Sequence, residues 1–288
     1  MIKTIPEVAE ILKRGGVCAF PTETVYGLGA HPFHPEAIQR IFAIKGRAGD
    51  QPLSLHISQL GELFKFGQDI PSMANRFINR FWPGPLALIV PSSPLVPSQA
   101  RSNRQTASFR YPNHFQFREL GRLVGAPLIA TSANRSGSLS AVCSLDAEAE
   151  LGEWIDGTVD GGPCDYALDS TLVDLTTDPP TVLREGAIGL ELLQEQTGFH
   201  LKLVGRKLVR LEVLFLPEGK SFPEDQSGDI VVLKSVPKKE SMFFSLLADL
   251  QKQNVSKVYI PAEFSLQNKV VQRLWFRGQK KRGDGNCK

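Results

Sequence analysis

Helix and strand signals alternate along the first 200 residues of this 288-residue chain, and this alternation limits the fold more than any other feature. Helices are predicted where apolar residues recur every three or four positions and where proline or glycine marks an end. Short strands are predicted where apolar residues run together or alternate with polar ones. The expected helices cover residues 5–14, 35–46, 72–81, 115–124 and 188–196, and the expected strands 17–20, 53–57, 86–90, 106–110, 127–130, 170–174 and 181–184. Helices interleaved with this many strands indicate an α/β fold.

Three of the predicted strands carry polar side chains on one face. They are Ser54 and His56 in the first, Thr106, Ser108 and Arg110 in the second, and Ser170 in the third. Each strand taken alone is most simply interpreted as facing solvent. Together they indicate a concave binding site, because helices are expected to cover most of the sheet in such a fold.

Residues 201–288 differ from the rest of the chain in charge. The first 200 residues carry 16 Lys and Arg against 21 Asp and Glu, a net charge of −5, whereas the remainder carries 17 against 9, a net charge of +8. Strand signals at 209–216, 229–233 and 258–260 and helix signals at 242–253 and 266–275 predict a small α/β domain here, so the expected domains are 1–200 and 201–288. The basic end at 277–282 is interpreted either as a solvated, frayed terminus or as a weak electrostatic handle for RNA.

Composition argues against several classes of protein. No apolar run approaches the roughly 18 residues of a membrane-spanning helix, and the first residues lack the apolar segment of a secretory signal, so we expect a cytoplasmic protein with no membrane partner. The four cysteines are far apart and the five histidines are scattered, which favours neither a zinc site nor a disulfide framework. The chain contains neither G-x-x-x-x-G-K-[ST] nor G-x-G-x-x-G. A bound nucleotide would therefore be held by scattered side chains.

Two cations, Lys45 and Arg47, stand where a predicted helix ends. One interpretation is that they complement the negative end of the helix dipole, which contributes roughly a few tenths of a kcal/mol. The other is that an ammonium and a guanidinium together neutralise a triphosphate and the charge that builds on departing pyrophosphate. Ser132 and Asn134 follow a predicted strand, where they either cap a turn or offer neutral donors and acceptors to a ligand.

The sequence gives little support to covalent or metal-centred catalysis. No serine, cysteine or histidine lies in a convincing nucleophile-and-base pattern. No carboxylate cluster is suited to hold Mg²⁺ by itself, so any magnesium is expected to be carried largely by nucleotide phosphates. The segment Tyr-Gly-Leu-Gly at 26–29 is predicted to be a flexible turn that lets the backbone approach a ligand.

Seven short motifs, taken in order, resemble the YrdC-like threonylcarbamoyl-AMP synthases over about residues 5–200. They are Pro-Thr-Glu-Thr-Val-Tyr-Gly-Leu-Gly at 21–29, Lys-Gly-Arg at 45–47, Gln-Pro-Leu at 51–53, Phe-Arg-Tyr-Pro at 109–112, Ser-Ala-Asn at 132–134, Asp-Ser-Thr-Leu-Val-Asp at 169–174 and Leu-Arg-Glu-Gly at 183–186. The resemblance implies a twisted open mixed sheet with helices around a positive cavity. It also implies that threonylcarbamoyl-AMP and pyrophosphate are made from L-threonine, bicarbonate or CO₂, and ATP. The product would feed downstream transfer proteins that modify the tRNA adenosine beside the anticodon.

The same resemblance implies roles for individual residues. L-Threonine would be bound by Thr24, His56, Arg110, Ser132 and Ser170, with Arg110 pairing with its carboxylate. ATP would be contacted by Lys45, Arg47, Gln51, Thr106, Asn134, Val142 and Arg184. Lys45 and Arg47 would also be the catalytic residues, because they would stabilise the charge on the leaving pyrophosphate. The resemblance implies no metal bound by the protein itself.

The chain departs from the family pattern in several places. Gln51 stands where Asn is usual, Ala48 where Pro is usual, and Ala141-Val142 where Pro-Thr is common, so a contact from Val142 to ATP would be made by the backbone. The linker Ser-Pro-Gly-Met-Lys-Tyr-Arg-His-Tyr-Ala-Pro of the long members is absent. Two other functions stay open: a non-catalytic module of the same fold that binds double-stranded RNA or tRNA, and an enzyme that transfers a carbamoyl or adenylyl group to a different amino acid.

Overall fold

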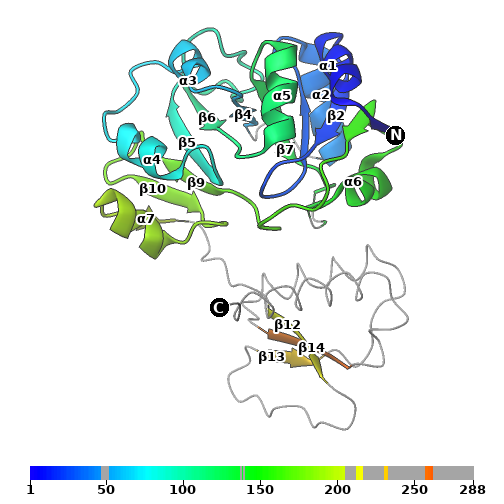
Figure 1. Ribbon diagram of the computed structural model, residues 1–288. Coiled ribbons are helices and arrows are strands. Elements are labelled where there is room, and N and C mark those ends of the chain that lie inside the picture. The colour runs from blue at the N-terminus through cyan, green and yellow to red at the C-terminus, as the bar shows by residue number, and fades with distance from the viewer. Residues whose placement is uncertain are drawn as a thin grey trace, which may run out of the picture. The chain divides into compact units, whose positions relative to one another are not determined.

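The computed structural model describes residues 1–46, 52–136, 138 and 140–204, together with the backbone of three strands further along the chain. The chain divides into two compact units, of which the first comprises Met1–Ser136 and Ser140–Leu208 (Figure 1). The division into domains 1–200 and 201–288 stays a prediction. Strand β11 (Lys202–Leu203) pairs with the main sheet of the first unit, so that sheet continues past residue 200.

The described part of the first unit is built on one 11-stranded mixed sheet (Figure 1). The strands lie in the order β1-β8-β2-β3-β7-β4-β6-β5-β9-β10-β11. Besides β11, they are β1 (Ile2–Lys3), β2 (Val17–Phe20), β3 (Gly27–Ala30), β4 (Ser54–His56), β5 (Leu86–Pro91), β6 (Thr106–Arg110), β7 (Leu128–Ser132), β8 (Gly157–Val159), β9 (Thr171–Asp174) and β10 (Thr181–Arg184). The α/β class and the open mixed sheet expected from the sequence are confirmed.

The described helices of the first unit connect these strands, and the five that the sequence predicts are present. They are α1 (Ile5–Lys13), α2 (Pro35–Lys45), α3 (Gly61–Phe66), α4 (Ala74–Phe81), α5 (Phe115–Val124), α6 (Ser144–Leu151) and α7 (Leu190–Thr197). Local chemistry fixes their ends. The Thr4 amide donates to the Glu7 carboxylate at 2.8 Å in front of α1, and α2 ends at Gly46, whose left-handed φ of 62° suits glycine. The short α3 and α6 were not predicted.

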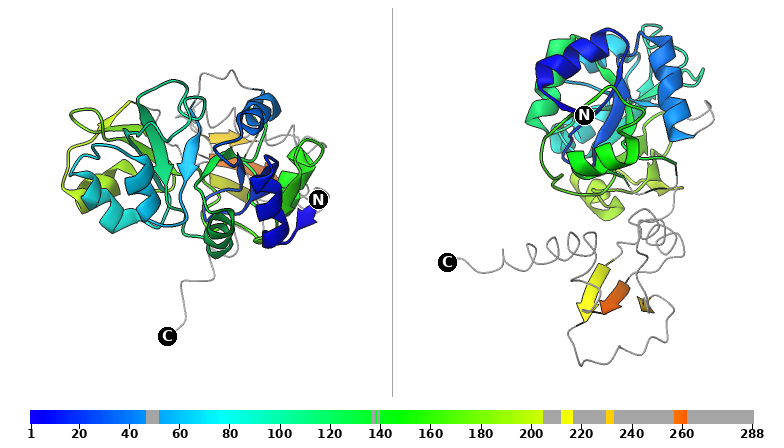
Figure 2. Two further views of the ribbon diagram at one scale, coloured as in Figure 1. Left: turned by 90° about the horizontal axis from the view of Figure 1, so that it is seen from above. Right: turned by 90° about the vertical axis from the view of Figure 1, so that its right-hand side faces the viewer.

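Helices cover both faces of the sheet (Figure 2). Successive residues of β2 point to opposite sides, so Cys18 and Phe20 join one hydrophobic cluster and Val17 and Ala19 join the other. The first cluster is completed by the apolar faces of α1 and α5. The second is larger and includes apolar residues of α2, α3 and α4. The α1 and α5 cluster covers only part of its face, which leaves the neighbouring strands on that side available for a site.

The sequence prediction of a flexible turn at 26–29 is wrong, because Gly27–Ala30 forms strand β3 between β2 and β7. The glycines serve close packing instead. A Cβ on Gly27 would lie 2.6 Å from the Phe20 ring, and one on Gly29 would lie 2.4 Å from the carbonyl oxygen of Ile129. A glycine-rich segment can therefore be predicted to be a turn although it forms a strand, because a large side chain packs against its glycines.

In the second unit, the described residues form three parallel strands in the order β12-β14-β13. They are β12 (Glu212–Leu216), β13 (Ile230–Val232) and β14 (Lys257–Pro261). The strands predicted near these positions are thus confirmed. The helices predicted at 242–253 and 266–275 and the basic end at 277–282 lie outside the described residues.

Candidate ligand-binding site

A cavity of about 180 Å³ lies over the central strands of the sheet. Its floor is made of alternate residues from neighbouring strands, since Ser54 lies opposite Ser108 and His56 lies opposite Arg110 in the register of β4 and β6. The residues between them, such as Leu55 and Phe109, are buried in the apolar core on the other face. The period-two pattern of polar residues in the sequence therefore marks one real surface of the sheet.

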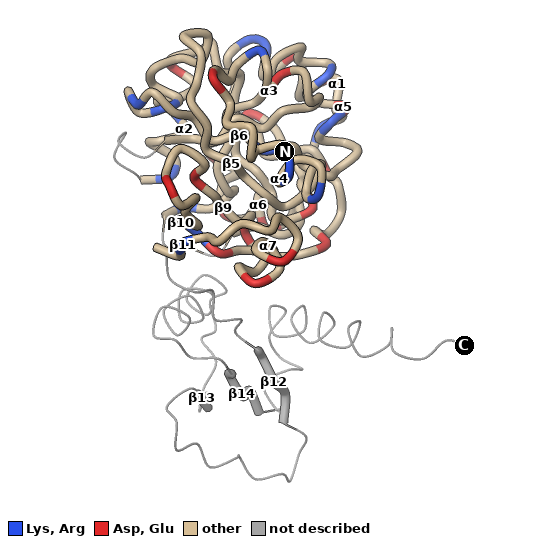
Figure 3. Tube along the Cα trace, turned by 90° about the vertical axis from the view of Figure 1, so that its left-hand side faces the viewer, with Lys and Arg blue, Asp and Glu red and all other residues tan. Residues whose placement is uncertain are grey.

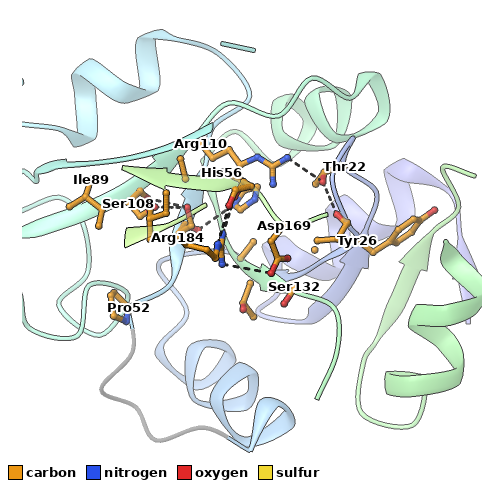
Figure 4. Close-up of a pocket in the computed structure, with 18 residues that line it drawn as sticks. Thr22, Tyr26, Pro52, His56, Ile89, Ser108, Arg110, Ser132, Asp169 and Arg184 are labelled. Carbon is orange, nitrogen blue, oxygen red and sulfur yellow. Dashed lines mark hydrogen bonds and ion pairs between the residues drawn. The ribbon is translucent and has the colours of Figure 1, made fainter. Parts of the chain in front are cut away.

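Five residues to which the family resemblance gives a role line this cavity together (Figure 4). They are His56, Arg110, Ser132, Ser170 and Arg184. They come from β4, β6, β7, the start of β9 and β10, which are far apart in the chain but neighbours across the sheet. The cavity thus joins two guanidinium groups with hydroxyl and imidazole groups, and the guanidinium groups suit the negatively charged groups of a small ligand.

Arg110 forms a buried ion pair that the sequence did not predict. Its Nη2 lies 3.0 Å from Oε1 of Glu23, and the two side chains are only 4 % and 2 % exposed. The same nitrogen lies 3.4 Å from the Thr22 hydroxyl, while the Nε of Arg110 has no hydrogen-bond partner. Glu23 therefore places a counter-charge beside one nitrogen of the guanidinium, without a hydrogen bond from the described residues to either of its own oxygens, and leaves other donors of Arg110 for a ligand.

His56 is a neutral group at the inner wall of the cavity. Its ring meets Phe20 and Phe117 edge-on, with centroids 6.5 and 5.8 Å away. Burial, helped by the nearby Arg110 guanidinium, lowers the pKa of His56 to about 3. The imidazole is accordingly uncharged at neutral pH and can exchange hydrogen bonds with a ligand without adding a positive charge.

Lys45 links α2 to the end of β7. Its ammonium donates to the Ser132 carbonyl oxygen at 2.6 Å and to Oδ1 of Asn134 at 2.7 Å, and the Ser132 hydroxyl donates to the same Oδ1 at 2.6 Å. Lys45 is 1 % exposed and is not among the residues that line the cavity. The Lys45 and Ser132–Asn134 motifs are therefore one hydrogen-bonded unit, and Lys45 does more than complement a helix dipole.

Two further motifs interlock beside the cavity. The Thr171 hydroxyl accepts hydrogen bonds from the amides of Gly186 and Ile188 at 2.9 and 3.0 Å, so the 169–174 motif is tied to the last residue of the 183–186 motif and to the chain just after it. Arg184 in turn donates from Nε to the Ser170 carbonyl oxygen at 3.0 Å and from Nη2 to the Ser170 hydroxyl at 3.1 Å. Its Nη1 lies 3.9 Å from Oδ2 of Asp169, and both side chains of this pair are partly exposed.

The remaining predicted site residues lie outside the cavity lining or outside the described part of the chain. Thr24 is fully buried behind Thr22, with their hydroxyls 2.9 Å apart, and it is Thr22 that lines the cavity. Thr106 begins β6 beyond the lining. Both backbone groups of Val142 are engaged, the amide with Asp146 and the carbonyl with Cys164. Arg47 and Gln51, and with them Ala48, fall outside the described residues.

Sequence reasoning missed three residues of the site: Thr22, Glu23 and Asp169. Thr22 and Thr24 are indistinguishable in sequence, since both are threonines two positions apart in one motif. Glu23 is recognisable only through its contact with Arg110, which depends on the fold. Asp169 stands directly before Ser170 in the 169–174 motif, so its position in the sequence is itself a signal.

The described residues give no sign of a metal centre or a membrane segment. No group of three or more His, Cys, Asp or Glu side chains in that part of the chain is arranged to hold a metal ion. In the same residues, no helix has the length and apolar character needed to cross a bilayer.

The sheet order and the two-arginine cavity on one face of the sheet together define a YrdC-like α/β protein. The chain belongs to the Sua5/YciO/YrdC family, described as "telomere recombination", whose pattern matches residues 10–186. This range contains all seven motifs.

The relatives named threonylcarbamoyl-AMP synthase include proteins of Pyrococcus abyssi, 38 % identical over 190 residues, and Bacillus subtilis, 37 % identical over 195 residues. These matches cover 66 % and 67 % of this chain, and the chain spans about half of each relative, 56 % of its length. A crystal structure of P. abyssi Sua5 complexed with L-threonine is also similar, with a TM-score of 0.69 and 26 % identity, covering 97 % of this chain and 94 % of that one.

Proposed function

We propose that this protein is an L-threonylcarbamoyladenylate synthase, a nucleotidyltransferase that makes threonylcarbamoyl-AMP and pyrophosphate from L-threonine, bicarbonate or CO₂, and ATP. The single observation that carries the proposal is the cavity, which gathers His56, Arg110, Ser132, Ser170 and Arg184 from separate strands onto one surface. The names of the relatives support the same activity, as does the L-threonine bound by the P. abyssi protein.

Threonine is proposed to bind beside Arg110, His56, Ser132 and Ser170. The free edge of the Arg110 guanidinium pairs with the carboxylate, since Glu23 already lies beside the other edge. The neutral His56 ring and the serine hydroxyls exchange hydrogen bonds with the polar groups of the amino acid. Thr22 joins this set in place of Thr24, because its side chain is the one that reaches the cavity.

ATP is proposed to bind on the side of Arg184, Lys45 and Asn134. Arg184 offers a guanidinium at the cavity wall, and Lys45 supplies a buried positive charge next to the Ser132 and Asn134 side chains. Arg47, Gln51, Thr106 and Val142 belong to the same proposal. Mg²⁺ would enter with the ATP phosphates, which supply most of its ligands.

The reaction is proposed to have two steps. The ammonium group of threonine first releases a proton to solvent, and the resulting amine nitrogen attacks the carbon of CO₂ and releases a second proton to solvent, which gives a carbamate. A carbamate oxygen then attacks the α-phosphorus, the bond between the α- and β-phosphates breaks, and pyrophosphate leaves with the bonding electrons. The protein contributes by positioning the three reactants and by stabilising the charge on pyrophosphate, for which Lys45 and Arg47 are the proposed groups.

The product is a mixed anhydride, and we propose that downstream transfer proteins pass its threonylcarbamoyl group to the tRNA adenosine beside the anticodon. A weak contact between RNA and the basic end at 277–282 is part of this proposal. The alternative of an RNA-binding module is less well supported by charge. In the view of Figure 3, acidic and basic positions are interspersed along the chain trace of the first unit.

Release of pyrophosphate tests the proposal. The purified full chain is incubated with ATP and Mg²⁺, with and without L-threonine and with and without bicarbonate. We expect release only when both are present, together with formation of the mixed anhydride. No release combined with tight tRNA binding would favour the binding module. Release that requires another amino acid would favour a transferase of different specificity.

A further inference from the structure

Asp169 is a carboxylate at the cavity to which the family resemblance gives no role. It lies two positions before β9 and lines the cavity between Arg184 and Ser132 (Figure 4). Among the described residues that form the lining it is the only one with a carboxylate, whereas Arg110 and Arg184 contribute two guanidinium groups. A cavity with both signs of charge suits a ligand with both signs of charge.

The backbone of Asp169 is held firmly. Its carbonyl oxygen accepts a hydrogen bond from the Ala187 amide at 2.9 Å. The chain at Gly186 passes so close that a Cβ there would lie 2.2 Å from the same oxygen. Only glycine permits this approach, so the 183–186 motif fixes the point from which the Asp169 side chain projects.

The carboxylate itself is lightly engaged. Oδ2 lies 3.9 Å from Nη1 of Arg184, and Oδ1 accepts a hydrogen bond from the Ser140 hydroxyl at 3.4 Å. Both contacts are at the long end of their ranges. Arg184 directs its shorter hydrogen bonds to Ser170 instead. The Asp169 carboxylate, 37 % exposed, therefore keeps acceptor capacity on the cavity side.

The other nearby carboxylate cannot take the same role. Glu23 is 2 % exposed and lies against Arg110 at 3.0 Å. Neither of its oxygens has a hydrogen-bond partner among the described residues, but both are buried, its charge is opposed by Arg110, and it is not among the residues that line the cavity. A positively charged group of a ligand thus finds its acceptor at Asp169 and not at Glu23.

We propose that Asp169 binds the ammonium group of the substrate amino acid and makes the cavity select α-amino acids over analogues that lack the amine. This inference rests on the proposed function, in which Arg110 takes the carboxylate of the same molecule. Asp169 acts in binding rather than in the chemical step, because an N–H of the carbamate can still donate to its carboxylate after the ammonium charge is lost. A contact that the bound substrate and the transition state share raises KM when it is removed and leaves kcat nearly unchanged.

The test compares wild type with Asp169→Asn in pyrophosphate release at saturating ATP and bicarbonate. KM and kcat are measured for L-threonine, and an inhibition constant is measured for 2,3-dihydroxybutanoate, which carries a hydroxyl in place of the amine. Asp156→Asn is the matched control. Asp156 has the same 37 % exposure and pairs with Arg40 at 2.8 Å, but it lies outside the cavity lining.

We expect Asp169→Asn to raise the KM for threonine about 10- to 100-fold, the usual effect of losing one charge-assisted hydrogen bond. Its kcat and its inhibition by the analogue should stay within about twofold of wild type, as should all three constants of Asp156→Asn. An unchanged KM for threonine overturns the inference. An equal loss of affinity for threonine and for the analogue also overturns it, because that result indicates a structural role. A changed Mg²⁺ dependence with an unchanged KM for threonine overturns it too, because that result indicates a metal ligand. If wild type releases no pyrophosphate in response to threonine, the proposed function fails and the inference with it.

Discussion

The protein contains two arginine–carboxylate pairs at the same cavity, and they differ in almost every physical respect. Arg110 and Glu23 are 3.0 Å apart and 4 % and 2 % exposed, whereas Arg184 and Asp169 are 3.9 Å apart and 47 % and 37 % exposed. The first pair is removed from water, so each charge needs the other. The second pair is partly exposed to water and its charged atoms are farther apart, so each partner can exchange the other for a ligand. The buried pair helps to form the cavity wall, and the exposed pair is available to contact a ligand that enters the cavity.

The comparison is tested most severely by Glu23→Gln. Removal of the charge leaves the buried Arg110 guanidinium without compensation, and breaking a pair of this kind costs about 3–5 kcal/mol. We expect the free energy of unfolding to fall by that amount in denaturant titrations. The double variant Glu23→Gln, Arg110→Gln should recover part of the loss, because the unpaired charge is gone. A single variant within about 0.5 kcal/mol of wild type would show that the pair is not a structural element.

Lys45→Ala is expected to have the next largest effect. The substitution removes a buried charge and the donor that holds the Ser132 carbonyl and Asn134. By analogy with the loss of an oxyanion donor, the barrier should rise by about 2–4 kcal/mol, so kcat for pyrophosphate release falls roughly 30- to 1,000-fold. Lys13→Ala, on the exposed end of α1, serves as the control and should be neutral. Pyrophosphate release at the wild-type rate from folded Lys45→Ala would contradict the assignment.

His56 makes stability depend on pH because its pKa is about 3 in the folded protein and 6.5 in the reference state. The unfolded chain takes up a proton below about pH 6.5 and the folded chain does not, so stability is lost as pH falls through this window. Between about pH 7.5 and pH 5, wild type should lose about 2 kcal/mol more than His56→Gln. Unfolding by urea at both pH values measures the difference. Equal losses in the two proteins would mean that His56 is protonated in the folded state.

The sequence predicts seven of the eleven strands in the described sheet, and the polar face of three of them, because these strands have clear local patterns. Alternation at Ser54 and His56 is visible in five residues of chain, whereas the register that places His56 opposite Arg110 is seen only in the structure. Contacts between distant segments have no such local signature. The Glu23 partner of Arg110 and the Ser132 partner of Lys45 follow from the order of strands, which a single sequence does not reveal.

The error at β3 has a related cause. Glycine commonly indicates backbone freedom, but Gly27 and Gly29 are needed here because Phe20 and Ile129 leave no room for a side chain. A flexible turn and a closely packed strand can have the same glycine-rich composition, and only the neighbouring strands distinguish the two. Asp169 shows the reverse situation. Its place beside Ser170 is local and visible, yet an aspartate before a strand is also what a simple turn would carry.

Asp169→Asn gives the smallest expected effect on stability and so completes the contrast with Glu23→Gln. A half-exposed ion pair at 3.9 Å contributes about 0–1 kcal/mol, and the backbone of Asp169 stays fixed by Gly186 and Ala187 whatever its side chain is. We expect the free energy of unfolding to stay within about 0.5 kcal/mol of wild type in the same titrations. A loss above about 2 kcal/mol would place Asp169 with Glu23 as a structural carboxylate. Near-neutral stability together with impaired threonine binding in Asp169→Asn would separate the two pairs. Loss of a carboxylate charge would then destabilise the fold at Glu23 and weaken only substrate binding at Asp169.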